Sequence, residues 1–218
     1  MGSSDVEQNE RLGNIIAVLI ALATLIGAVV AWRASVAADG AGDADFAGQR
    51  ATVNLEQTRA LSAVNSYEDY SAFANYQRYG QLGDLIETDE AGLNEKDAEN
   101  LDIERANAHD LAIANQGLFP NKFLNRDGSY ALQRQLGEEF ADAAKEKDLQ
   151  PNPHYEEADK LRSKTNQLLM AVTILAVALV FYSLVEAVNK RLHYPLLALG
   201  TLCLVAGTLY AFMIEFKG

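Results

Sequence analysis

The sequence predicts an all-α protein with three transmembrane helices and an acidic soluble helical bundle inserted between spans one and two. Three observations predict this class. Three apolar runs, residues 14–32, 168–184 and 196–212, contain no Asp, Glu, Lys or Arg. Residues 34–165 hold 25 Asp and Glu against 13 Lys and Arg. No stretch alternates apolar and polar residues for long enough to predict a strand. The predicted segments, in chain order, are a polar tail (1–12), transmembrane helix 1 (13–33), the acidic helical domain (34–165), transmembrane helix 2 (166–188), a basic connector (189–195), transmembrane helix 3 (196–214) and a tail (215–218).

The first apolar run has two interpretations, a retained span or a secretory signal peptide. Small residues from Ala34 to Ala38 would suit signal cleavage. The run is longer than a usual signal core, however, and one Arg and three acidic residues precede it. Trp32 and Arg33 suit the boundary of a bilayer. We therefore expect a retained span.

The last two apolar runs are joined by a short connector that contains Lys190, Arg191 and Pro195. Each run has about the 17 residues that mark the lower limit for a bilayer-spanning helix. Neither run has the polar stripe of a soluble helix, which indicates lipid on every side. The sequence therefore predicts a transmembrane hairpin. Basic residues flank the spans at both membrane faces, so the side of the acidic domain is left open.

The acidic domain is predicted to consist of helices joined by short turns. Residues 37–48, rich in Ala, Gly and Asp, predict a flexible link or a broken helix. A long helix is expected over 49–87 and a second over 95–116. Ser129 is the expected N-cap of a third helix that runs to about residue 148 and is stopped by the prolines that follow. The helix leading into span two is expected to begin at Tyr155.

The clearest pattern in this domain is one aromatic side chain at every third residue of the long helix. These residues, the aromatic stripe, are Tyr67, Tyr70, Phe73, Tyr76 and Tyr79. A step of three falls short of a full turn by roughly 60°, so the aromatic stripe winds around the helix. The simpler interpretation is packing by different neighbours along the helix. The alternative is a partner or oligomer interface, where Tyr is enriched.

Small residues four apart recur inside two of the predicted spans. They are Ala23, Gly27 and Ala31 in span one, and Cys203, Gly207 and Ala211 in span three. Such spacing lets helices in lipid approach closely. It is consistent with packing within one chain and with oligomerisation.

Composition and motifs exclude several kinds of function. The net charge of −12 argues against nucleic acid and against anionic lipid headgroups as partners. The single cysteine excludes a disulfide framework. Three scattered histidines lack metal-ligand spacing, and phosphate-binding and nucleophile motifs are missing. We therefore expect no catalytic, cofactor or metal site.

Three segments carry a resemblance to a known family. They are residues 57–79, residues 130–147 and the run Glu156-Glu157-Ala158-Asp159-Lys160-Leu161. With the span layout, they resemble a bacterial family of small three-span membrane proteins that has a helical segment between spans one and two. The acidic region 84–102 departs from that pattern. The resemblance implies a bacterial plasma membrane and no known activity.

Three functional hypotheses follow. The first is a non-enzymatic multi-pass membrane protein, a structural or accessory subunit whose acidic helical domain binds a protein partner or a second copy. The second is a membrane-anchored sensor with a ligand-binding bundle. The third is a self-assembling effector that permeabilises membranes, motivated by the small residues in the spans.

Overall fold

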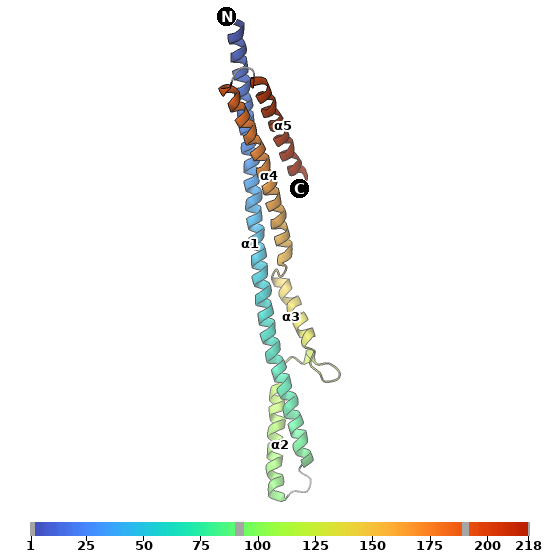
Figure 1. Cartoon of the computed structure of the whole chain (residues 1–218). Helices are drawn as coiled ribbons and strands as arrows, with labels where there is room; N and C mark the ends of the chain where they lie inside the picture. The colour runs from blue at the N-terminus through green and yellow to red at the C-terminus, as the bar shows by residue number, and fades with distance from the viewer. Residues whose placement is uncertain (1–2, 90–93, 189–191, 218) are drawn as a thin grey trace. The chain divides into compact units, whose positions relative to one another are not determined.

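The computed structural model describes residues 3–89, 94–188 and 192–217, and this part of the chain is helical almost throughout. The described residues form five α-helices, which are labelled in Figure 1. They are α1 (Ser3–Asp89), α2 (Glu95–Gln116), α3 (Leu132–Glu146), α4 (Pro151–Ala187) and α5 (His193–Lys217), with a 3₁₀ turn η1 (Asn121–Phe123) before α3. In these ranges β pairing is limited to an isolated bridge between Leu124 and Tyr130. The predicted all-α class is confirmed.

Three of the helices, α1, α4 and α5, are long and apolar enough to cross a membrane. The chain forms two compact units, which are described separately. Unit 1 comprises Met1–Gln49 and Pro151–Gly218, and unit 2 comprises Arg50–Gln150. Helix α1 contributes its first part to unit 1 and its remainder to unit 2.

The core of unit 1 is built by one face of each of its three helices. Helices α4 and α5 lie antiparallel as a hairpin, and α1 packs on the same core (Figure 1). Tyr182 of α4 is the largest fully buried side chain. It lies against Gly200 of α5, where a Cβ would be 2.7 Å from the tyrosine ring. The core residues are Ile16, Ala23, Val30 and Ala34 of α1, Leu168, Ala171, Leu175, Ala178, Tyr182 and Val185 of α4, and Leu204, Ala211 and Ile214 of α5.

Residues 37–48 are helical, so the predicted flexible link or broken helix is wrong. Their small side chains serve contact with α4. A Cβ on Gly40 would lie 3.3 Å from Leu161, and a Cβ on Gly48 would lie 2.8 Å from Tyr155. The later glycine meets the earlier α4 residue, so the two helices run antiparallel. Ala and Gly are used here because larger side chains would hold the backbones apart.

The buried residues of α1 in this region follow a strict pattern. Val30, Ala34, Ala37, Ala41 and Ala44 are buried at alternating steps of four and three. That spacing averages 3.5 residues, which keeps a seam facing a partner helix along a coiled coil. Helix α4 repeats the pattern through Leu168, Ala171, Leu175, Ala178, Tyr182 and Val185. The contact between α1 and α4 is thus an antiparallel coiled coil with small side chains on the α1 side.

Two further boundaries differ from the sequence prediction. Helix α4 begins at Pro151 rather than at Tyr155, because proline is tolerated in the first helical turn, where N–H groups have no helical acceptor. Helix α3 begins at Leu132, and Ser129 is not its N-cap. Ser129 instead donates its N–H and its hydroxyl to Asp127 Oδ1, at 3.0 and 2.7 Å. Gly128, at φ +82°, supplies the left-handed residue of that turn.

In unit 2, the second predicted helix is confirmed at both ends, since α2 spans Glu95–Gln116. Asn94 is its N-cap, and the Asn94 side chain accepts from the Asp97 N–H at 3.0 Å. Glu95 and Asp97 place negative charge at the positive end of the helix dipole, which stabilises the start of α2. Residues 90–93 and Asn189–Arg191 of the predicted connector lie outside the described residues.

Candidate functional site

The densest cluster of side chains in unit 2 is aromatic, and it joins α1 to the segment between α2 and α3. Phe73 is 9% exposed and Phe119 is 5% exposed. Their ring centroids are 5.6 Å apart at an interplanar angle of 90°, an edge-to-face arrangement that aromatic quadrupoles favour. Tyr130 lies 5.4 Å from Phe73, and Tyr76 lies 5.8 Å from Phe119. The cluster therefore anchors the loop before α3 to α1.

A polar network begins at the hydroxyl of Tyr130 and runs to α1 through a buried amide. The Tyr130 hydroxyl donates to Gln135 Oε1 at 2.8 Å, and Gln135 is 1% exposed. Gln135 Nε2 donates to Asp69 Oδ2 at 2.6 Å and to Glu139 Oε1 at 3.0 Å. The amide thus uses its acceptor and both donors, as a buried polar group must to offset the loss of hydration.

Burial and neighbouring charge shift two pKa values in this network. Burial raises the pKa of Asp69, and the nearby Glu139 and Glu68 carboxylates add to the shift, while the Gln135 hydrogen bond opposes it. Burial together with the charges of Asp69 and Glu139 raises the pKa of Tyr130 to about 12. Tyr130 therefore stays neutral and acts as a donor at physiological pH. The network holds α3 against α1.

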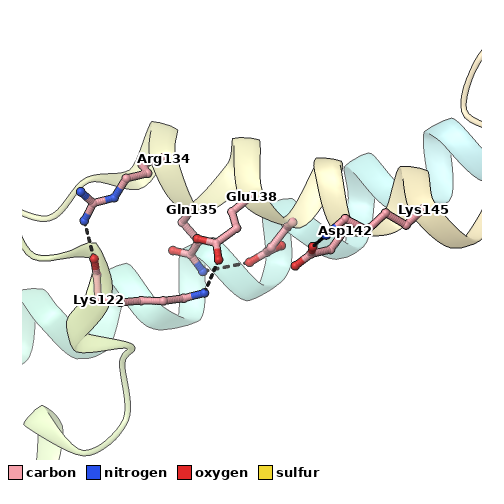
Figure 2. A network of polar contacts seen from close by, with 7 residues as sticks. Lys122, Arg134, Gln135, Glu138, Asp142 and Lys145 are labelled. Atoms are coloured by element: carbon pink, nitrogen blue, oxygen red, sulfur yellow. Dashed lines mark hydrogen bonds and ion pairs between the residues drawn. The ribbon is translucent and has the colours of Figure 1, made fainter.

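Exposed ion pairs lie beside the buried Gln135 on α3. Figure 2 shows Lys122 reaching Glu138, with Nζ and Oε1 2.6 Å apart, and Arg134 donating to the carbonyl oxygen of Lys122. Asp142 and Lys145 pair along the helix at 2.7 Å. The side chains of Lys122, Asp142 and Lys145 are more than half exposed and that of Glu138 is slightly less exposed, so water screens these pairs and they contribute little to stability. They orient η1 beside α3 and form a solvated face.

The aromatic stripe of α1 is divided between the interior and the surface of unit 2. Phe73 lies in the aromatic cluster and Tyr76 is partly buried against it. Tyr70 is 47% exposed, although its ring contacts Phe73 and Tyr130. Tyr79 is partly buried, with the Arg78 guanidinium 5.9 Å from its ring centroid. Tyr67 is 75% exposed, so a partner interface stays a prediction that concerns chiefly Tyr67 and Tyr70.

A charged group in unit 1 joins all three apolar helices at one end, and sequence reasoning missed it. Arg33 of α1 pairs with Glu215 of α5. Lys164 of α4 approaches the other oxygen of that carboxylate, with Nζ 3.3 Å from Oε2, but without hydrogen-bond geometry. The signal was available, because Arg33 and Glu215 each follow a charge-free run by one to three residues, and three successive spans of alternating direction place the C-terminal ends of the first and third runs at the same side.

The predicted small residues differ in what they contact. Ala23 and Ala211 are buried in the core of unit 1. A Cβ on Gly207 would lie 3.1 Å from Leu175, so this glycine does allow close approach of α4 and α5. Gly27 has open space around its Cβ position. Ala31 is exposed and Cys203 is partly buried. Oligomerisation through Gly27 and Ala31 stays a prediction.

Polar groups elsewhere line an open groove of about 500 Å³ between α1 and α2 in unit 2. His109 lies opposite Gly83, where a Cβ would be 2.7 Å from the imidazole. The side-chain amides of Gln77, Gln81 and Gln116 and the carboxylate of Asp84 add to the polar lining. Within the described ranges, no three His, Cys, Asp or Glu residues are grouped so that they could hold a metal ion.

Comparison of the chain with protein-family models, with curated proteins and with solved structures gives no match. The resemblance to a bacterial three-span family therefore stays a prediction.

Proposed function

We propose that this chain is a non-enzymatic multi-pass membrane protein, a structural or accessory subunit. In this proposal α1, α4 and α5 cross the bilayer, and the acidic helical segment between α1 and α4 is soluble. That segment presents an apolar, tyrosine-bearing surface of α1 to a protein partner or to a second copy. The resemblance to the three-span family makes a bacterial plasma membrane the proposed location.

Support for membrane insertion comes from the outward side chains of unit 1. Val18, Leu25 and Trp32 of α1 are 66%, 64% and 62% exposed, and Leu202 of α5 is 65% exposed. Burying a large apolar side chain is worth roughly 1.5–3 kcal/mol, so a row of them facing water would be costly. A bilayer removes this cost, because every outward side chain then faces lipid.

The charged group of unit 1 fits the edge of such a bilayer. Arg33, Lys164 and Glu215 are each partly exposed, and they lie where the charge-free runs end. At the level of the lipid headgroups these side chains can pair and remain hydrated, whereas the same charges at the bilayer centre would be expensive. The group would also fix the depth of all three helices together.

The observation that carries the functional part is the exposure of apolar side chains on α1 in unit 2. Tyr67, Val53 and Val64 are 75%, 64% and 54% exposed. Residues 50–150 otherwise hold 19 acidic and 10 basic residues, which makes a repeated apolar surface unusual. Exposed apolar side chains that share one face of a helix favour an interaction site, and tyrosine is enriched in such sites.

A photocrosslinking experiment tests the proposal in native membranes. A photoreactive amino acid is placed at Tyr67 of the full chain, and at Asn65 as a matched control, since Asn65 is an exposed residue on another side of α1. The chain should stay with membranes after an alkaline wash. Irradiation should give a discrete higher-mass adduct from position 67 and little from position 65. Release by the wash, or equal labelling at both positions, would contradict the proposal.

A further inference from the structure

We propose that unit 2 pairs with a second copy of itself through one stripe of α1, as a parallel, in-register two-helix coiled coil. The stripe, termed the outer stripe, consists of Val53, Gln57, Ala60, Val64, Tyr67, Ser71 and Ala74. This inference rests on the proposed function and names its partner. Of the aromatic stripe, only Tyr67 belongs to the outer stripe.

The outer stripe has the spacing of a coiled-coil seam. From Val53 onward its members are separated by steps of four and three residues, an average of 3.5. All seven residues are exposed. A coiled coil has two alternating core positions, a and d. Val64 lies at an a position, and Ala60 and Tyr67 lie at d positions, so apolar or small residues occupy both kinds. Such a seam requires a facing helix with the same period.

No helix of unit 2 covers this stripe, because the packed face of α1 lies on the opposite side. Thr58, Ser62 and Ser66 are 5%, 4% and 3% exposed, and they precede Ala72 and Phe73 on the buried face. At 100° per residue, Ser62 points about 160° away from Val64. In this region α1 therefore has two seams on opposite faces, one filled within the unit and one empty in the described part of the chain.

A second copy fits the empty seam better than an unrelated helix does. Two copies anchored in one bilayer have the same orientation and depth, so their α1 helices run parallel and identical residues meet. Gln57 then faces Gln57 of the second copy. A carboxamide carries both a donor and an acceptor and can pair with its own kind, and a polar residue at a seam position selects one register.

The charges beside the stripe permit this pairing in spite of the acidic domain. In a parallel coil, residues flanking the seam meet partners five positions further along the other helix. Glu56 would meet Leu61 of the second copy, and Ala63 would meet its Glu68, so no two carboxylates face each other. Arg59 pairs with Glu56 on its own helix, with Nη1 2.6 Å from Oε1, and this pair offsets the negative charge of Glu56 beside the stripe.

Single cysteines in the full chain test the inference. In a Cys203→Ala background, Ala60→Cys, Val64→Cys and Tyr67→Cys probe the stripe, while Arg59→Cys and Asn65→Cys are exposed controls on other sides of α1. Mild oxidation in native membranes should give at least tenfold more disulfide-linked dimer at positions 60, 64 and 67 than at 59 and 65. Disulfide geometry brings Cα atoms within about 7 Å, so self-linkage at three seam positions requires parallel, in-register helices.

The outcomes separate this inference from the proposed function. Equal dimer yields at stripe and control positions would overturn the inference. In samples that mix two single-cysteine variants, a disulfide that forms only between position 60 and position 67 would indicate antiparallel helices and would also overturn it. A photocrosslink from position 67 to another protein, with no disulfide dimer, overturns the pairing and leaves the proposed function intact. Loss of both the photocrosslink and the dimer overturns both.

Discussion

Replacing Phe73 with alanine should destabilise the packing of α3 and the preceding loop against α1, whereas replacing Tyr67 on the same helix should not. Phe73 is 9% exposed and contacts the rings of Phe119, Tyr130 and Tyr70, with centroids 5.6, 5.4 and 6.1 Å away. Tyr67 is 75% exposed. The two positions are close in sequence and differ mainly in burial, which makes Tyr67→Ala a matched control.

The cost of Phe73→Ala can be worked out from this environment. Deleting a buried phenylalanine typically costs about 3–5 kcal/mol. Three aromatic neighbours favour the upper part of this range, because each aromatic pair contributes roughly 0.5–1.5 kcal/mol beyond its buried area. Tyr70, however, is half exposed and can relax into the space left behind. We therefore expect a loss of about 3–4 kcal/mol, and less than about 0.5 kcal/mol for Tyr67→Ala.

Amide hydrogen exchange of the detergent-solubilised full chain, diluted until it is monomeric so that Tyr67 is exposed, measures this loss locally. If α3 and the loop before it open as a unit, protection of peptides covering residues 119–135 should fall roughly 150- to 900-fold in Phe73→Ala. Protection of α4 and α5 in unit 1 serves as an internal reference. A change of less than about threefold, or an equal loss in Tyr67→Ala, would refute the conclusion that Phe73 and its neighbours hold this loop.

The remaining predictions concern close packing and pH. Gly200→Ala should destabilise unit 1 in detergent by about 1–3 kcal/mol in a denaturation titration, because the added Cβ would lie 2.7 Å from Tyr182. Gly27→Ala, with open space around it, should be neutral or stabilising in the same titration. Equal effects of the two substitutions would contradict the assigned packing. Burial raises the pKa of Tyr130 to about 12, above the value near 10 of an unfolded tyrosine. The stability that neutral Tyr130 contributes is therefore fully present below about pH 10 and is lost as pH rises towards 12. Absorbance titration should therefore show a late-titrating phenolate component that is smaller by one tyrosine in Tyr130→Phe, and an unchanged late component in the variant would count against the assignment.

The apolar runs and the extent of α2 were predictable because each depends on local signals. A run without charges needs no tertiary context, and Asn94 with acidic residues after it forms a helix start that can be read from sequence. The start of α3 was not predictable in this way. Ser129 suits a helix N-cap, but its hydroxyl is used within the turn, where it accepts from Asn125 Nδ2 and donates to Asp127 Oδ1, and tertiary contacts of Tyr130 favour the turn.

Residues 37–48 show a different reason for error. Glycine and aspartate suggest a link when composition is considered alone, because both lower helix propensity and favour turns, whereas the alanines between them favour a helix. Their helical role depends on α4, more than a hundred residues later, which supplies Tyr155 and Leu161 to the glycine surfaces. The steps of three and four among the alanines were visible and would have predicted a seam. The members of the polar network at Gln135 came from separate helices, so sequence spacing could not group them.

The alanine-rich contact between α1 and α4 also bears on how the two helices choose their alignment. Repeated alanines present nearly the same surface every seven residues, so sliding one helix along the other by one repeat would preserve many of the small contacts. What distinguishes the observed alignment is a few unlike features, namely Tyr155 over Gly48, Leu161 over Gly40, and the ion pair of Asp45 with Arg162. A few side chains therefore determine how α1 and α4 align. A shift of one repeat would set Tyr155 against a residue that bears a Cβ, either Ala41 or Leu55.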